Sequence, residues 1–581
     1  MPPDDLPLVL LFEVPPVTDA DRENLAHQRY KVRGTIVDLV PPIDWRMDPH
    51  DHVSWRFWLH TMQFLDVPLR IYERDGDLEA LAKARDLALD WVAGNPIGGE
   101  RTGDYAWYDM STGMRAAFLG YVWRECRRND LLEPGRESEL TASLYVHADW
   151  LSDEANYKPQ TNHGLFEDAG LYVMAEYATE LPESAEWREF AEHRFLETLA
   201  RHVQFDEGAH KEHSPGYHFY IRDLVKLLNE RAGIGGERLG ELVGRLDAAA
   251  GWMVLPDGTT TPFGDTDMNQ APAFARDAAG NDGFRVFQRA GYAFARRNGS
   301  YLGFTCCYHT YAHKHADELS WCLFENGHLV VGEASRYGYR DEEDPARIYA
   351  RASHGHNVLI VDDESFPWRG QTPYGSGLLA SGEGAGWYAV LGRNPLLKGV
   401  DHRRLLLYRP GELVLVVDKV DAEQEHTIDR RLHFGPDLVA SESDRAIVAR
   451  GEDERVIATL IEGSEAPVEI SSARGIEEPR MDGWTFPRDL TKVPSDVVTL
   501  RSRLATGLLI HGIATGSSVP STVSARTAPR YWWRALRRRP VEGDPIVVEI
   551  NGEQGGSEVR VFQSGTQLSV ETAGLTRPGR S

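Results

Sequence analysis

The stretch that decides the fold is Pro256–Ala273, PDGTTTPFGDTDMNQAPA, where a helical pattern stops and a strand pattern begins. Its prolines, glycines and aspartates are residues that end regular elements and form turns. Upstream, from about Trp55 to Val254, apolar residues recur every three or four positions. Examples are DLEALAKARDLALDWVAG (77–94) and SAEWREFAEHRFLETLARHVQ (184–204). This spacing predicts a series of amphipathic helices.

Downstream of the same stretch, apolar residues alternate with polar ones. The segments SYLGFTCCYHTY (300–311), RLLLYRPGELVLVVDKVDA (404–422) and SDVVTLRSRL (495–504) are examples, and turn residues such as Pro-Gly separate strands. This period predicts antiparallel strands in a large sandwich. Because helices and strands are segregated, we predict an α+β multidomain chain: an N-terminal extension (1–50), an α/α toroid (51–275) and an antiparallel β-sandwich (276–581).

Length, charge and cysteine content limit the class of protein. The 581 residues are enough for two or three domains. The formal net charge of −26 argues against a nucleic-acid or anionic-membrane binder, because such partners require a positive surface. The four cysteines are irregularly spaced, so we expect reduced core thiols rather than a disulfide scaffold.

Two further segments bear on location and partners. The N-terminal residues MPPDDLPLVLLFEVPPV lack a basic region and form a poor signal peptide, and no stretch has the ~20 apolar residues of a membrane span. We therefore expect a soluble, cytoplasmic protein without a transmembrane segment. The basic, aromatic segment APRYWWRALRRRP (Ala528–Pro540) is either a solvated loop or a contact with a glycan, a partner or a membrane surface.

The densest group of reactive side chains is YHTYAHKHAD (Tyr308–Asp317). On an extended segment, His313 and His315 point to the same side, so both can serve one site. Glu333 ends the next predicted strand and His356 begins another. The two imidazoles of His315 and His356 with the Glu333 carboxylate form a set suited to zinc or a similar divalent ion, and core histidines are the alternative.

Two motifs in the helical half add candidate residues. TNHG (Thr161–Gly164) precedes a helix, and there Asn162 is either a helix cap or a functional amide, whereas a cap does not explain His163. HKEHSPGYHFY (His210–Tyr220) carries His213 and Tyr217 on a loop that leads into a helix. A buried core aromatic is the alternative for Tyr217.

Together these segments resemble the heparinase II/III-like family of polysaccharide lyases, which includes alginate lyases of the same architecture. The matching positions are Asn162-His163, Tyr217 in SPGYH, His313 to Asp317, LVVGEASRYGY to Tyr339, and His356-Asn357. The resemblance covers roughly residues 50 to 420. It implies an incomplete α/α toroid followed by an antiparallel β-sandwich. Glu333 departs from the family, which usually has an aspartate in this run.

The resemblance also implies an acidic, uronate-containing poly- or oligosaccharide as the substrate and β-elimination as the reaction. Asn162 and His163 would neutralise the uronate carboxylate. Tyr217 would act as base and acid in turn, or as acid with His313 as base, depending on which faces of the sugar react. His163, Arg222 or a metal would provide positive charge that helps Tyr217 to deprotonate. Trp107, Arg115, His213 and Arg222 are candidate substrate contacts, and a zinc ion on His315, Glu333 and His356 would be structural.

Two alternatives and one open point remain at this stage. An α/α-toroid hydrolase would use paired carboxylates such as Asp168 with Asp265 or Asp267. A glycan-binding protein without activity would keep the fold, although the presence of all four reactive residues speaks against it. A homodimer is an open alternative to a monomer.

Overall fold

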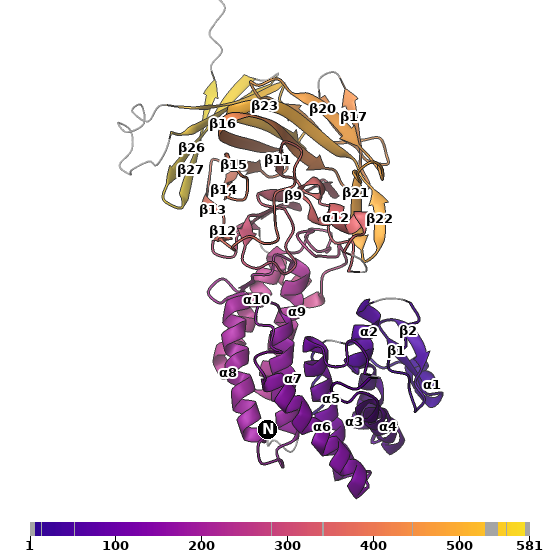
Figure 1. The fold of residues 1–581 in the computed structure, drawn as a ribbon. Coiled ribbons are helices and arrows are strands. Elements are labelled where there is room, and N and C mark those ends of the chain that lie inside the picture. The colour runs from indigo at the N-terminus through magenta and orange to yellow at the C-terminus, as the bar shows by residue number, and fades with distance from the viewer. Residues whose placement is uncertain are drawn as a thin grey trace, which may run out of the picture. The chain divides into compact units, whose positions relative to one another are not determined.

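The computed structural model describes residues 6–12, 14–50, 53–100, 102–280, 282–339, 342–443, 446–528, 544–552 and 555–575 (Figure 1). Contacts divide the chain into two compact units. The first comprises Met1–Gly208 and Tyr220–Arg245, and the second comprises Ala209–Phe219 and Leu246–Ser581. This division differs from the predicted boundary at residue 275, because part of the helical half belongs to the second unit.

The first unit is helical, as its 3.6-residue period predicts. Its short N-terminal part contains α1 (Asp19–Ala26) and the hairpin of β1 (Arg29–Val32) with β2 (Thr35–Asp38). The helices that follow are α2 (Val53–His60), α3 (Asp66–Asp75), α4 (Leu78–Gly94), α5 (Asp109–Arg128), α6 (Pro134–Ser152), α7 (His163–Tyr177) and α8 (Ser184–His202). Helices α9 (Pro215–Leu227) and α10 (Gly236–Trp252) each contribute residues to both units.

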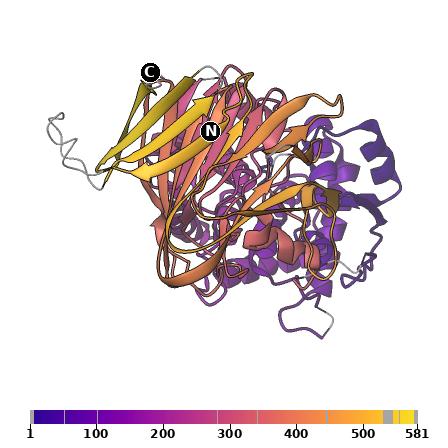
Figure 2. The ribbon, with the colours of Figure 1, turned by 90° about the horizontal axis from the view of Figure 1, so that it is seen from above.

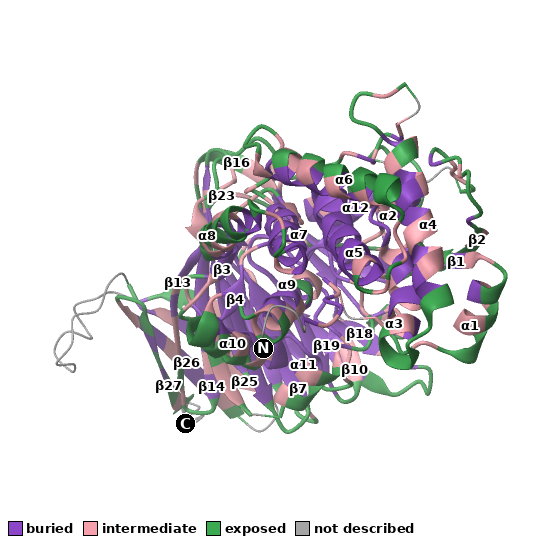
Figure 3. Cartoon of the chain, turned by 90° about the horizontal axis from the view of Figure 1, so that it is seen from below, coloured by how far each residue is buried: buried purple, intermediate pink, exposed green. Residues whose placement is uncertain are grey.

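Helices α5 and α7 form the buried centre of the first unit (Figure 3). Two glycines let their backbones touch, because a Cβ added at Gly170 would lie 1.9 Å from the Gly113 oxygen. Gly113 lies against Phe166 and Glu167, and Gly120 lies against Met174, so the two helices run in the same direction. Their N-termini therefore lie side by side, which matters for the residues described below.

The second unit contains two main sheets, which are antiparallel apart from one parallel strand pair in the larger sheet. The smaller sheet has the order β10 (His328–Val331), β9 (Ser320–Glu325), β7 (Ser300–Thr305), β6 (Tyr292–Arg297), β5 (Gly283–Phe287). The larger sheet is built on the long strands β16 (Leu413–His433) and β23 (Val497–Ala514), which pair along most of their length. Figure 2 shows its orange and yellow strands side by side.

The remaining strands of the larger sheet continue on both sides of this central pair. On one side lie β19 (Val456–Glu462), β18 (Ala446–Arg450) and β17 (Val439–Ser443), and on the other β15 (Val400–Arg409), β14 (Trp387–Asn394), β13 (Leu378–Gly384), β27 (Gln567–Leu575), β26 (Gly555–Ser564), β25 (Ile546–Gly552) and β24 (Thr522–Thr527). Strand β11 (Leu359–Val361) also pairs with β16, and β20 (Glu469–Ala473) pairs with β23.

The two sheets share one apolar core. Leu302, Trp321 and Leu323 of the smaller sheet belong to the same buried cluster as Leu406 and Val416 of the larger sheet. This packing is the predicted sandwich, in which alternate residues of each strand face the partner sheet. The smaller elements of the unit are α11 (Ala273–Ala278), α12 (Pro345–Arg351), β8 (Cys307–Tyr308) with β12 (Gly375–Ser376), and β21 (Trp484–Arg488) with β22 (Thr491–Pro494).

Three other predictions can be compared with the structure. The four cysteines are buried and free, as expected for reduced core thiols. None of the helices in the described ranges has the length and apolar character needed to cross a membrane. The basic, aromatic segment 528–540 lies outside the described residues, apart from Ala528.

Candidate active site

Tyr217 lies in the first turn of α9, where the sequence Ser-Pro-Gly-Tyr starts a helix. Pro215 fits this position because its missing N–H is not needed there. The Ser214 hydroxyl accepts a hydrogen bond from the Tyr217 backbone N–H (3.4 Å) and donates one to the Asp265 carbonyl (2.9 Å). The start of α9 is thereby attached to the loop that follows α10. These residues all belong to the second unit.

The rings of Tyr217 and His313 stack on each other, with centroids 3.3 Å apart and an angle of 20° between their planes. His313 has a positive φ of 53°, a conformation that is unfavourable for a residue with a side chain. Such backbone strain concentrates at functional sites, where neighbouring contacts hold it. The structure thus brings together two of the predicted catalytic side chains.

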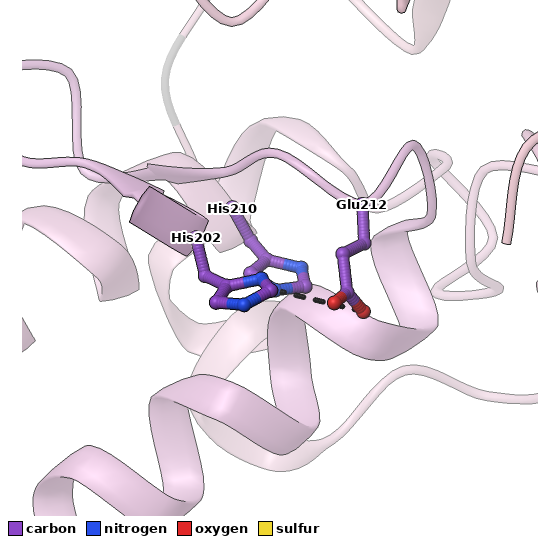
Figure 4. Close-up of side chains that lie close together, drawn as sticks. All are labelled: His202, His210 and Glu212. Carbon is purple, nitrogen blue, oxygen red and sulfur yellow. Dashed lines mark ion pairs between the residues drawn. The ribbon is translucent and has the colours of Figure 1, made fainter. Parts of the chain in front are cut away.

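A buried carboxylate orients His313. The Nδ1–H of His313 donates to Glu212 Oε2 at 3.0 Å, and the Glu212 side chain is fully buried. His210 Nε2 lies 3.9 Å from the same oxygen, and Figure 4 shows the side chains of His210 and Glu212 facing each other. Since Nδ1 is engaged, Nε2 is the His313 nitrogen that can take up a proton.

The Tyr217 hydroxyl begins a chain of three hydrogen bonds. It lies 3.1 Å from the Tyr339 hydroxyl, which donates to Asp265 Oδ2 at 2.8 Å. The other oxygen of Asp265 accepts a hydrogen bond from His315 Nε2 at 2.9 Å. A proton at Tyr217 is therefore connected through one hydroxyl to a buried carboxylate.

The surroundings of Asp265 and Tyr339 determine which of these two hydrogen-bonded groups is charged. Burial disfavours the carboxylate, but the hydrogen bond and charge of His315 hold the pKa of Asp265 well below its usual range. Burial and the charge of Asp265 raise the pKa of Tyr339 well above its ordinary value. Tyr339 is therefore a protonated donor to an ionised Asp265, and its oxygen is available to accept the Tyr217 O–H.

Arg336 supplies positive charge to the same group of side chains. Its guanidinium binds Asp267 through two hydrogen bonds of 2.6 and 3.1 Å and lies 5.2 Å from the centre of the Tyr339 ring. Burial opposes its charge, but Tyr339 and Asp267 raise the pKa of Arg336 above its ordinary value, and Tyr217 adds to this effect. Arg336 therefore favours ionisation of Tyr217.

In the first unit, Asn162 and His163 lie where α7 begins. Asn162 is buried, and its side chain makes no capping hydrogen bond to the described backbone of this helix, so the cap interpretation fails. The Nδ1–H of His163 donates to Asp109 Oδ1 at 2.9 Å, and about a third of the His163 side chain (32%) is exposed. Asp109 is the first residue of α5, so the parallel packing of α5 and α7 creates this pair.

Both units match one protein family. The N-terminal heparinase II/III model matches residues 20–280, and the C-terminal heparinase II/III-like model matches residues 279–560. The chain belongs to the heparinase II/III family. The resemblance inferred from the motifs is thus confirmed.

Solved structures of heparinases share the fold of this heparinase II/III chain. The heparan sulfate lyase HepC from Pedobacter heparinus is 18% identical, with 94% of this chain and 90% of HepC covered and a TM-score of 0.67. A crystal structure of heparinase III is 15% identical, with coverages of 98% and 93% and a TM-score of 0.73. The predicted fold class is therefore confirmed. A comparison with curated protein sequences gives no match.

The predicted metal ligands of the heparinase II/III chain fit a divalent ion in part. His315 and His356, with ring centroids 5.2 Å apart, each bind a carboxylate through one nitrogen. The other nitrogens, His315 Nδ1 and His356 Nε2, are buried and have no partner among the described residues. Metal-binding histidines show this arrangement.

Glu333 is placed differently from the two histidines. Its Oε2 accepts from His356 Nδ1 at 2.5 Å, and its Oε1 accepts from the Ser320 hydroxyl. Within the described residues, His315, Glu333 and His356 do not bring three ligand atoms within 4.8 Å of one another. Glu333 therefore orients His356 in this structure, whereas the two imidazoles keep the nitrogens that suit a metal.

The predicted substrate contacts divide into one half-exposed residue and three buried ones. Arg115 is fully buried, with its guanidinium 3.8 Å from the centre of the Trp91 ring and its Nε donating to His147 at 3.0 Å. Trp107 is half-buried and donates from Nε1 to the Asn95 carbonyl at 2.9 Å. In this structure Arg115 supports the aromatic residues from below, and a contact with a glycan stays a prediction.

His213 and Arg222 are also buried. His213 is 1% exposed, donates to the Ala312 carbonyl (3.1 Å) and accepts from the His309 N–H (3.0 Å), so it braces the loop before His313. Arg222 is 3% exposed, and its guanidinium donates to Asp223 at 2.8 Å. Within the second unit, Arg336 supplies positive charge near Tyr217.

The carboxylates of the hydrolase alternative are engaged elsewhere. Asp168 is fully buried and accepts hydrogen bonds from Arg194 (2.7 Å) and Tyr157 (2.7 Å). Asp265 accepts hydrogen bonds from Tyr339 and His315, and Asp267 forms an ion pair with Arg336. These contacts give each carboxylate a supporting role and do not favour paired acid–base hydrolysis.

Sequence reasoning missed Glu212, Asp109 and Arg336, and it gave Tyr339 no role. Charged residues are common in polar loops, so nothing in the sequence marks Glu212 or Asp109 as buried. Tyr339 lies in a run that the family resemblance had already singled out. Only the structure shows that the Tyr339 hydroxyl lies next to that of Tyr217.

Proposed function

We propose that the chain is a polysaccharide lyase that cleaves an acidic, uronate-containing glycan by β-elimination and leaves an unsaturated uronate at the new non-reducing end. The observation that carries this proposal is the stacked pair of Tyr217 and His313, each hydrogen-bonded to a system that ends in a buried carboxylate. Membership of the heparinase II/III family supports the reaction class. The substrate class rests on that resemblance.

The reaction needs a base, an acid and a way to stabilise charge on the substrate. The proton at C5 of a uronate becomes acidic only when the neighbouring carboxylate is neutralised. In our proposal, Asn162 donates from its amide to this carboxylate. His163, held by Asp109, donates from its exposed ring nitrogen.

Tyr217 and His313 transfer the protons. With His313 Nδ1 bonded to Glu212, His313 Nε2 can act as the base when the reacting groups lie on opposite faces of the sugar, and Tyr217 then protonates the leaving oxygen. When both groups lie on the same face, Tyr217 takes the C5 proton and returns it to the leaving oxygen. Arg336 favours the tyrosinate that this second route requires.

We also propose a structural divalent ion, with zinc as the first candidate. His315 and His356 would hold it through Nδ1 and Nε2, and Glu333 would orient His356. When bound, the ion would supply fixed positive charge beside the strand that follows His313. The chain's own residues carry out the proton transfers.

The test is a panel of uronate glycans: heparan sulfate, heparosan, chondroitin, hyaluronan and alginate. Cleavage by β-elimination creates a conjugated double bond, so we expect new near-ultraviolet absorbance with at least one of them. Tyr217→Phe, which keeps the ring but removes the hydroxyl, should abolish this signal. New reducing ends without near-ultraviolet absorbance would show hydrolysis and overturn the proposal.

A further inference from the structure

The second unit contains a cavity of about 320 Å³ that is separate from the candidate active site. Among the described residues that line it, none belongs to the candidate reaction or to the candidate metal site. Clefts of about 300–1,000 Å³ with mainly apolar walls are typical of sites for small ligands. Leucine and valine side chains from β14, β15, β16, β23, β26 and β27 form most of the walls here: Leu391, Leu405, Val417, Leu508, Val561 and Leu568.

The cavity leads from solvent into an apolar core of the larger sheet. Leu405 and Val417 on the central strands belong to one buried cluster with Val561 on β26. Two residues before Leu405 and two after Val417, the side chains are charged and exposed: Arg403 and Lys419, which also line the cavity. A ligand in this cavity would therefore have one end among apolar side chains and the other end beside two cations.

The register of β15 against β16 sets this order of side chains. Every second residue of a strand lies on the same face, and residues in register lie side by side. On the face that lines the cavity, successive cross-strand pairs are two carboxylates, two cations and two apolar side chains: Asp401–Asp421, Arg403–Lys419 and Leu405–Val417. The cations thus lie between the outer carboxylates and the apolar walls.

The cations on this face are crowded together. Arg403 is in register with Lys419 on one side and with Arg393 on the other, and like charges in such pairs repel each other. Asp401 is shared by both arginines, with its carboxylate 2.7 Å from Arg393 Nε and 3.3 Å from Arg403 Nε. Lys419 forms no ion pair with a described residue. An anionic group between Arg403 and Lys419 would relieve their repulsion.

We propose that this cavity binds a single-chain anionic amphiphile of the fatty acid class. Its carboxylate would lie between Arg403 and Lys419, and its hydrocarbon chain would lie against Leu405 and Val417. Burial of the chain provides affinity, and the two cations select the charge of the head group. The proposal does not depend on the lyase reaction, because the cavity and the reactive residues are separate.

The experiment is isothermal titration calorimetry of the full chain with sodium decanoate, at concentrations below micelle formation. We expect saturable binding of a single molecule per chain. Decyltrimethylammonium has the same chain and the opposite charge, so it should bind at least tenfold more weakly. Hexanoate has the same head group and buries fewer methylenes, so it should also bind at least tenfold more weakly.

Two substitutions test the two ends of the cavity. Lys419→Met keeps the apolar stem and removes the charge, and it should raise the dissociation constant for decanoate about three- to tenfold. Leu508→Trp enlarges a half-buried wall residue of β23, and it should abolish binding by filling the cavity. Melting temperatures should show that each variant is folded. If Leu508→Trp does not fold, Lys419→Met and the two comparison ligands decide the question.

The control is Lys398→Met. Lys398 is an exposed lysine between β14 and β15 that does not line the cavity. Its loss should leave the dissociation constant unchanged, which separates the effect of Lys419 from the loss of any positive charge.

Several results would overturn the proposal. They are equal affinity for decanoate and decyltrimethylammonium, equal affinity for decanoate and hexanoate, an unchanged dissociation constant in Lys419→Met, and binding that does not saturate. Residues 529–543, which connect β24 to β25, lie outside the described residues, and Asp544 after them lines the cavity. If the wild-type chain does not bind decanoate but a chain without residues 529–543 does, the protein itself covers the cavity and the proposal fails.

Discussion

Tyr339 connects Tyr217 to Asp265, and it does so through a single hydroxyl whose own proton is directed at the carboxylate. Tyr217 therefore faces an acceptor that is fixed before substrate arrives, and Arg336 stabilises the charge that its deprotonation leaves. In our proposal, the chain of hydrogen bonds positions the Tyr217 oxygen, and the charge of Arg336 lowers the cost of removing its proton.

Tyr339→Phe keeps the ring and removes this link. We expect kcat to fall about 10- to 100-fold with KM changed less than about threefold, because binding does not involve the hydroxyl. Initial rates of near-ultraviolet absorbance measure both constants. Tyr337→Phe, two residues away and packed on Phe486, is the control and should behave as wild type. Equal rates in the two variants would contradict the role of Tyr339.

Glu212→Gln tests the carboxylate behind His313. The amide can still accept from Nδ1–H, but it carries no charge to stabilise a protonated imidazole. We expect kcat to fall about tenfold or more while the affinity for glycan, measured with the Tyr217→Phe background, stays the same. A loss of affinity without a loss of kcat would place Glu212 in binding instead.

The motifs singled out Tyr217 and His313, whose rings the structure brings together. They were not sufficient to find Glu212, Asp265 and Arg336 as a group, since a charged residue in a polar loop looks the same whether it is exposed or buried. Arg115 shows the converse: its motif was conspicuous, but the guanidinium supports aromatic rings from below.

Helices α5 and α7 show how packing places functional residues. The contact of Gly113 with Gly170 lets the two helices lie close enough for Asp109 to reach His163. Periodicity predicted both helices, since their residues follow the 3.6-residue repeat. Periodicity could not predict that these two helices are neighbours. Helix pairing depends on how well two helix surfaces fit each other, and a periodic pattern does not describe that fit.

Gly170→Ala should destabilise this pair. The added Cβ would lie 1.9 Å from the Gly113 oxygen, so the helices must separate, at a cost of about 1–3 kcal/mol. Urea unfolding measures the change. Gly244→Ala, in α10 with nothing within 4 Å of the added atom, is the matched control and should be neutral or slightly stabilising. Equal stability of the two variants would contradict the close contact.

We expect Glu167 of α7 to make the stability of the folded protein depend on pH. Burial, followed by the charges of Asp109 and Asp168, raises the pKa of Glu167 to about 8 from an ordinary value of 4.5. Between these values the folded chain keeps a proton that the unfolded chain loses, so stability falls as pH rises. Glu167→Gln should therefore stabilise the protein at pH 8 by about 1–3 kcal/mol and have no such effect below pH 4.5.

Thermal melts of Glu167→Gln at pH 4.5, 6 and 8 check this expectation. The advantage over wild type should grow with pH, by about 2–4 °C per kcal/mol. Glu189→Gln, an exposed position on α8, serves as the control and should show a constant difference. An advantage that shrinks as pH rises would reverse the predicted sign.

The second unit as a whole is where a structural metal would act. His315 and His356 are both buried, with ring centroids 5.2 Å apart, so an ion between them would connect the loop after His313 to the segment that leads into β11. Dialysis against a chelator should lower the melting temperature and the activity together, and zinc should restore both. Elemental analysis should show that His356→Ala abolishes metal binding.

A different pattern would change the interpretation of the metal. If activity disappears on chelation while the melting temperature stays the same, the ion is not structural. If neither changes and no metal is found, His315 and His356 serve as hydrogen-bonding groups for Asp265 and Glu333. The proton-transfer residues proposed above do not depend on this outcome.

The segment 209–219 joins the second unit although its neighbours in sequence, up to residue 208 and from residue 220, belong to the first. It contributes Glu212 and Tyr217, which contact His313 and Tyr339 from beyond residue 300. The boundary between the two family models, near residue 280, therefore separates side chains that must fit one another. Chimeras made by exchanging halves of homologous chains at that boundary would inherit a tyrosine from one parent and its partners from the other. Recombination that preserves activity should transfer residues 209–219 together with the β half.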